Sequence, residues 1–125
     1  MNFLRVFIGL LLILFASCKK TSIPDPDNSA KTASAEFLMR HQFLDSSSHL
    51  TDTAVAGAVL IYASSTERDN DLNRIDSAYS STGVIVFSAL TKSHYWYRAS
   101  SGIFGSKDGD LSTPAGAVAH ETVLF

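Results

Sequence analysis

The chain has 125 residues, with ten lysines and arginines against twelve aspartates and glutamates, and a formal net charge of −2. This length suits one domain with a modest core, and the mildly acidic, scattered charge excludes the basic surface that nucleic-acid binding needs. The single cysteine excludes an internal disulfide and a cysteine-based zinc site, so its position in the chain is its informative property.

The first 17 residues have the three-part layout of a secretory signal. Arg5 supplies positive charge, an apolar run covers residues 6–16, and small residues end at Ser17, directly before Cys18. The run is too short for a transmembrane helix, which needs about 20 apolar residues. Two lysines also follow Cys18, and positive charge on that side disfavours a lasting span. We therefore expect residues 1–17 to be an apolar signal helix that is removed on export.

The end of this leader, Leu14-Phe-Ala-Ser-Cys18, resembles a bacterial lipobox. The resemblance implies cleavage between Ser17 and Cys18 and acylation of Cys18, with palmitate-type chains as the membrane anchor. Two or more acyl chains anchor a protein stably in a membrane, because each methylene group buried in the lipid contributes about 0.8 kcal/mol to binding. By resemblance to lipoprotein sorting patterns, the absence of aspartate after Cys18 implies the outer membrane. The periplasmic face and the cell surface remain open alternatives.

Residues 18–35 predict a flexible linker that follows the lipidated cysteine. Ile23 is the only large apolar residue between residues 21 and 35, and small polar residues dominate the segment. Pro24 and Pro26 argue against an edge strand here. As a coil, the segment has a root-mean-square reach on the order of 20–25 Å. We therefore expect one folded domain over residues 36–125, held away from the lipid surface.

From Glu36 onward, apolar residues recur with a period near two, which predicts strands. A short helix is the alternative for the first strand. Short strands at regular spacing predict an all-β, antiparallel sandwich. The expected strands cover residues 36–44, 57–63, 76–80, 84–90, 94–99, 103–104 and 118–125, with loops at 46–52 and 64–76 and a turn at 107–110. The expected core-forming set is Leu60, Tyr62, Ile85, Phe87, Tyr95 and Tyr97.

Three of these segments share a further pattern. Residues 57–62 form an apolar run ending in tyrosine, residues 80–87 place Gly83 before Val-Ile-Val-Phe, and residues 95–99 read Tyr-Trp-Tyr-Arg-Ala. Together they resemble the prealbumin-like, or carboxypeptidase-regulatory-like, β-sandwich. The resemblance implies a Greek-key sandwich of about seven strands. It implies no activity, because one fold hosts many functions.

No pattern in the sequence predicts catalysis, a metal site or a cofactor. The four histidines, His41, His49, His94 and His120, lack the spacing of metal ligands. Residues 69–73 open like a calcium loop, but Arg74 stands where the loop needs glycine, and residues 108–110 fail in the same way. No Gly-x-Ser-x-Gly nucleophile elbow occurs. We therefore predict a non-enzymatic protein, with an uncharacterised hydrolase as the last alternative.

Trp96 is the candidate for a binding surface. Alternation along residues 94–99 places His94, Trp96 and Arg98 on the outward face of their strand. An outward tryptophan can stack on a sugar ring or dock a partner. The alternative is that Trp96 covers a sheet face beneath a loop or the linker. The leading expectation is a membrane-anchored module that binds a protein or glycan of the cell envelope. A structural accessory subunit of an envelope or secretion complex is the second.

Overall fold

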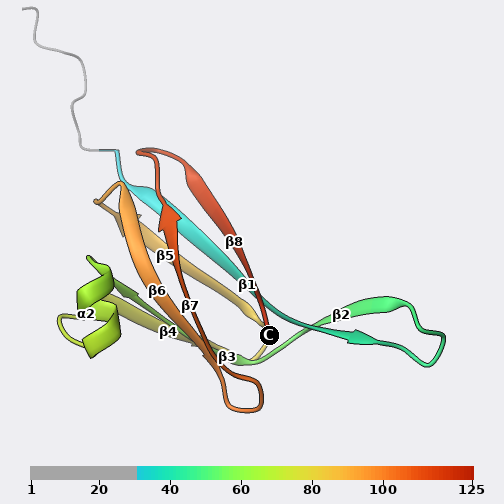
Figure 1. The fold of residues 1–125 in the computed structure, drawn as a ribbon. Helices are drawn as coiled ribbons and strands as arrows, with labels where there is room; N and C mark the ends of the chain where they lie inside the picture. Colours follow the sequence, from blue (N-terminus) through green and yellow to red (C-terminus); the bar gives the residue numbers. More distant parts are fainter. Residues whose placement is uncertain (1–30) are drawn as a thin grey trace, which may run out of the picture.

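The computed structural model describes residues 31–125, so the signal segment, Ser17, Cys18 and most of the linker lie outside the described residues. Two four-stranded sheets face each other (Figure 1). The first contains β1 (Ala33–Leu44), β2 (Leu50–Ala54), β5 (Val84–Leu90) and β8 (Val118–Leu124). The second contains β3 (Gly57–Tyr62), β4 (Asp76–Ser80), β6 (His94–Ser101) and β7 (Gly105–Ser112). One short helix, α2 (Ser65–Asn70), follows β3. The predicted all-β class is confirmed.

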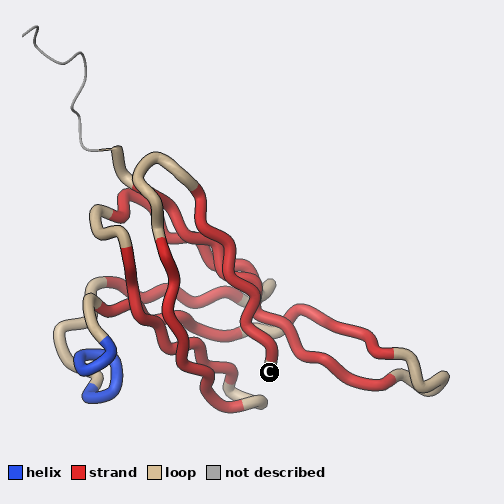
Figure 2. The backbone as a smooth tube through the Cα atoms, turned by 45° about the horizontal axis from the view of Figure 1, so that its top comes forward, coloured by secondary structure: helices blue, strands red, loops and turns tan. Residues whose placement is uncertain are grey.

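β1 is the central strand of the first sheet, and its two parts have different neighbours. Its first part pairs with β5, antiparallel, on one edge and with β8, parallel, on the other. Its last part pairs with β2. The Met39 N–H donates to the Gly83 carbonyl at 2.8 Å, and the Met39 carbonyl accepts from the Val55 N–H at 3.0 Å. β5 and β2 therefore lie on the same edge of β1, one after the other. Residues 40–54, called the arm below, leave the sandwich as a two-stranded hairpin (Figures 1 and 2).

The second sheet has the antiparallel order β4-β3-β6-β7, and α2 follows β3 in the chain. The Ser64 hydroxyl caps the helix by accepting from the Glu67 N–H, and Asp71 ends it in the left-handed region with φ of 50°. The loop expected over residues 64–76 is therefore wrong at Ser65–Asn70, where the chain forms α2. Ser64-x-x-Glu67 is a capping pattern that favours one helical turn even in a charged segment.

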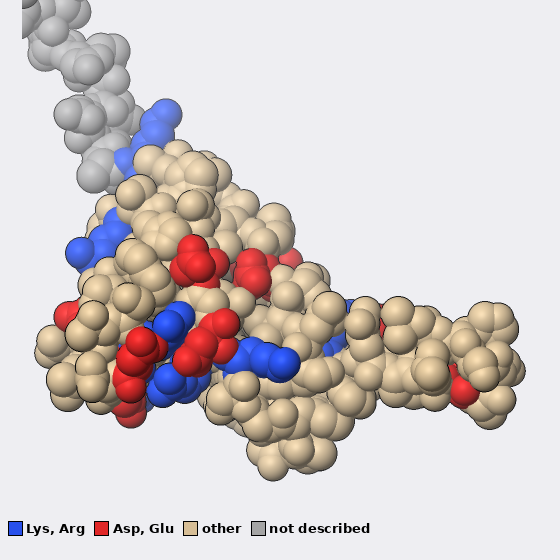
Figure 3. Space-filling view, in the orientation of Figure 1, with Lys and Arg blue, Asp and Glu red and all other residues tan. Residues whose placement is uncertain are grey.

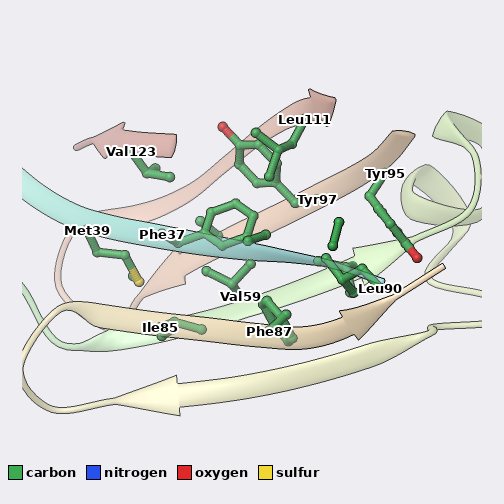
Figure 4. Packing of buried hydrophobic residues seen from close by; sticks show 14 of the residues in the cluster. Phe37, Met39, Val59, Ile85, Phe87, Leu90, Tyr95, Tyr97, Leu111 and Val123 are labelled. Atoms are coloured by element: carbon green, nitrogen blue, oxygen red, sulfur yellow. The ribbon is translucent and has the colours of Figure 1, made fainter. Parts of the chain in front are cut away.

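The core lies between the sheets, with Phe37 of β1 at its centre (Figure 4). Its ring meets Phe87 edge to face at a centroid distance of 5.9 Å, and Tyr97 of the opposite sheet at 5.0 Å. Edge-to-face pairs add to the energy of burial, so Phe37 joins the two sheets. The buried cluster comprises Ala33, Ala35, Phe37, Met39, Val55, Val59, Ile61, Ile85, Phe87, Leu90, Tyr95, Tyr97, Ala99, Leu111 and Val123.

Four of the six expected core residues belong to this cluster, namely Ile85, Phe87, Tyr95 and Tyr97. Leu60 does not, because Val59 and Ile61 face the core instead. The alternation of β3 cannot choose a face, since the strand is apolar on both. Tyr62 is fully buried but lies outside the cluster, and its hydroxyl donates to Asp71 Oδ1 at 2.7 Å beyond the end of α2.

The expected strands at 57–63, 76–80, 84–90, 94–99 and 118–125 are confirmed to within two residues at each end. The first strand begins at Ala33, inside the segment expected to be linker, because Ala33 and Ala35 are small enough to pack in the core. β2 occupies part of the expected loop at 46–52. Every residue of β2 is exposed, so no buried face signals a strand there.

The strand expected at residues 103–104 is wrong. Ile103 and Phe104 lie in the turn between β6 and β7, which Gly105 closes with φ of 83°. The turn expected at residues 107–110 lies inside β7. β7 is an edge strand whose polar, mostly exposed side chains lack the apolar alternation that predicts a strand.

Alkaline pH is expected to destabilise the sandwich through Tyr97. Burial and the hydrogen bond to Glu121 Oε1 (2.9 Å) raise the pKa of this phenol well above its usual value. The native state therefore favours the neutral phenol. Its contribution to stability is complete below the unfolded pKa of about 10 and is lost as pH rises toward the folded pKa. Thermal melts at increasing pH should show the melting temperature of the wild type falling more steeply above pH ~10 than that of Tyr97→Phe.

The matched control for this experiment is Tyr79→Phe, which removes a hydroxyl from a side chain that is 70% exposed. Its melting temperature should follow the wild-type pH profile. Equal alkaline slopes for the wild type and Tyr97→Phe would contradict the role given to the buried phenol.

Candidate functional site

The structure brings the three predicted surface residues of β6 together on the outer face of the second sheet. His94, Trp96 and Arg98 are each half-buried and alternate with the buried Tyr95 and Tyr97, as expected. The His94 ring meets Trp96 edge to face at a centroid distance of 4.4 Å. Its Nε2 lies 3.1 Å from Asp110 Oδ2. The tryptophan therefore has a neighbouring side chain within its own strand.

Charged side chains on this outer face are paired with one another. Arg98 donates to both carboxylate oxygens of Asp108 at 2.8 Å, and these bonds hold the pKa of Asp108 below its usual range. Arg68 of α2, whose side chain is 15% exposed, donates to Asp69 and to the Gly109 carbonyl of β7. Figure 3 shows acidic and basic groups side by side in this region. The hydrogen bond from Arg68 to Gly109 attaches α2 to β7, and the guanidinium of Arg98 already has a partner within the molecule.

The remaining histidines lie in separate places. His41 Nδ1 is 2.8 Å from the Phe125 carbonyl oxygen, His49 lies beside Asp45, and His120 Nδ1 is 3.1 Å from Glu36 Oε1. Within residues 31–125, no group of three His, Cys, Asp or Glu side chains is placed to hold a metal ion. In the same part of the chain, no helix is long and apolar enough to cross a membrane.

An apolar groove of about 460 Å³ includes the β6–β7 turn. In Figure 1 this turn lies at the end of the sandwich away from the start of β1. Three separate segments form the groove, namely the β2–β3 connection, Tyr79 of β4 and the β6–β7 turn. No charged side chain lines it. Ile103 is 85% exposed at its rim. The lining residues are Ala54, Val55, Ala56, Gly57, Tyr79, Ser101, Gly102, Ile103 and Phe104.

The groove continues onto the arm through Phe104. The His41 ring of β1 stacks on Phe104 at a centroid distance of 3.9 Å, and it also stacks with Phe43 at 6.2 Å. Farther along the arm, Leu44 and Leu50 are also exposed. Figure 3 shows few charges on the arm or at this end of the molecule. Exposed apolar surface that extends over neighbouring elements is typical of an interaction site.

Sequence reasoning missed this groove. The signal available was Gly102-Ile-Phe-Gly105, where two large apolar residues stand between glycines. As a short apolar pair it predicts a strand, whereas the structure has a glycine-flanked turn that presents both residues to solvent. The other two lining segments are distant in sequence, so no local pattern could join them to the turn. Ser17 and Cys18 lie outside the described residues.

Comparisons of the chain with known protein families, with curated proteins and with solved structures find no match. Function must therefore be inferred from the residues of this chain.

Proposed function

We propose that this chain is a bacterial lipoprotein, anchored to the outer membrane by acyl chains on Cys18, whose sandwich binds an envelope protein. The observation that carries the binding role is the apolar groove with its exposed Ile103, which includes the β6–β7 turn. A flexible linker that enters before β1 would hold the domain off the lipid surface and leave the groove accessible. The role needs no catalytic group or cofactor.

A protein partner fits the groove better than a glycan. The groove is lined by uncharged residues, and the exposed groups at its rim are aliphatic or aromatic. Buried aromatic and aliphatic anchors supply most of the energy in protein interfaces. The Trp96 surface is the glycan alternative, because a half-buried tryptophan beside Asp110 and Arg98 can stack on a sugar. The contact between His94 and Asp110 and the ion pair between Arg98 and Asp108 disfavour it.

The proposal includes the Greek-key, prealbumin-like form of the sandwich. Seven strands remain when β2 of the arm is set aside, the number that the resemblance implies. The chain passes between the sheets at the β2–β3, β4–β5, β5–β6 and β7–β8 connections, and the first and last strands pair in parallel. Crossings of this kind support a Greek-key topology.

The anchor is tested by expressing the wild type and Cys18→Ala in a Gram-negative host. Intact mass of the wild type should show loss of residues 1–17 and gain of acyl mass, and the protein should partition into detergent. Cys18→Ala should show neither change in mass. Release of both forms without acyl chains would contradict the anchor.

The groove is tested with a photo-crosslinking residue at position 103 in living cells, with position 65 on α2 as the control. A single cross-linked envelope protein should form from 103 and not from 65. Phe104→Asp should weaken that complex about tenfold or more, as expected when an apolar anchor is lost. Identical cross-links from both positions, or none from 103, would exclude the groove as the binding site.

A further inference from the structure

β5 is an open edge of the first sheet. Among the described residues it pairs with β1 alone. The Gly83 carbonyl accepts a bond from β1, and backbone groups along a strand point to alternate edges. Gly83, Ile85 and Phe87 therefore direct their backbone groups toward β1. The N–H and C=O groups of Val84, Val86 and Ser88 point away from it.

Most of this edge lacks the usual protection against pairing with another chain. Natural edge strands carry charges, proline or a bulge, or are very short. β5 has seven residues, Val-Ile-Val-Phe-Ser-Ala-Leu, with neither charge nor proline, and its bulge lies near its end, where Ala89 has φ of 57° and the register with β1 shifts. The other strands with an open edge in residues 31–125 all carry ionisable side chains, such as Asp76 on β4, Asp108 on β7 and Glu121 on β8. β5 is therefore the edge best suited to accept a further strand.

We propose that β5 pairs antiparallel with β5 of a second copy of this chain, across a twofold axis at Val86. In that register Val84 lies opposite Ser88, and Val86 lies opposite itself. All three residues direct their free backbone groups to the partner, so each N–H and C=O finds a complementary group. The result is one continuous sheet through both copies, in the closed, isologous arrangement of a twofold dimer.

The absence of charge on β5 favours its pairing with β5 of a second copy. An uncharged strand pairs with itself without bringing like charges together, whereas like charges directly opposite are destabilising. Twofold pairing of β7 would bring two copies of Asp108 and Asp110 close together. The outward side chains of β5 are compatible with a sheet surface, since Val86 is 54% exposed and apolar. This inference does not depend on the groove or on the lipid anchor.

The test is the mass of the whole chain by sedimentation equilibrium in density-matched detergent. The wild type should have the mass of two chains and dissociate on dilution. Val86→Pro should have the mass of one chain, because it removes an outward N–H without breaking the β1–β5 ladder. Val86→Lys should also be a single chain, because it places two ammonium groups opposite each other. Val86→Thr is the matched control and should remain a dimer. Circular dichroism verifies the fold of each variant.

A disulfide gives a second measurement that does not require a stable dimer in detergent. Opposed residues in a hydrogen-bonded antiparallel pair have Cα atoms about 5.5 Å apart, within the range that a disulfide spans. Val86→Cys should therefore form a cross-linked dimer on mild oxidation, and Ser106→Cys on β7 should not. The unaltered chain, oxidised in the same way, is the control that shows whether Cys18 itself forms a disulfide between copies. A wild type with the mass of one chain, together with no cross-link from position 86, would overturn the proposal.

Discussion

Phe37→Ala is expected to lower the free energy of unfolding by about 3–5 kcal/mol. Phe37 is 1% exposed and makes edge-to-face contacts with Phe87 in one sheet and Tyr97 in the other. Its removal leaves a cavity between sheets that cannot close without moving β1, which is paired on both edges. Equilibrium urea unfolding of the whole chain, followed by the fluorescence of Trp96, measures the change.

The same strand provides the control. Phe43→Ala removes the same atoms from a side chain that is 41% exposed on the arm. Substitutions at exposed positions away from the core usually change the free energy of unfolding by no more than about 0.5 kcal/mol. If Phe37→Ala cost no more than Phe43→Ala, Phe37 would not be the contact that joins the sheets.

Gly57→Ala is expected to destabilise the chain by about 1–3 kcal/mol or more. Gly57 begins β3, and a Cβ added there would overlap the Ser100 carbonyl oxygen and the Met39 terminal methyl group. The methionine can rotate away, but the carbonyl belongs to the backbone of the neighbouring β6. The added methyl group therefore has to push two paired strands apart.

The matched substitution is Gly102→Ala, whose new Cβ would meet nothing within 4 Å. Thermal melts of both variants separate the overlap from the general effect of replacing glycine, since only Gly57→Ala should lower the melting temperature by several degrees. Equal melting temperatures would show that the Ser100 carbonyl can shift freely.

The buried strands of this sandwich could be predicted, because burial requires apolar residues and these leave a recognisable pattern in the sequence. β3 and β5 are dense in aliphatic residues, and β6 has three consecutive aromatic residues along which burial alternates. Where a strand has no buried face, as in β2, or is a polar edge, as in β7, the sequence carries no such period. The side of β3 that meets the core could not be chosen either, since Leu60 and Val59 satisfy local patterns equally.

The candidate sites show the same division. The outward direction of Trp96 could be predicted from the alternation of side chains within one strand, and the structure confirms it. The pairing of Arg68 with Gly109 joins residues 41 positions apart. The groove joins the β2–β3 connection to the β6–β7 turn, which β4 and β5 separate in the chain. Contacts of that range depend on the folded topology, which local periodicity does not contain.

The change of neighbours at Met39 divides β1 into two regions of different local stability. Before Met39 the strand has a partner on each edge, whereas beyond Arg40 it has β2 alone. A two-stranded ribbon without a covered face is only marginally stable in water. Amide protons of the arm should therefore exchange with solvent through openings that leave the sandwich folded. Limited proteolysis should cut first near residues 45–49, so that the arm is the part of the domain that opens most readily.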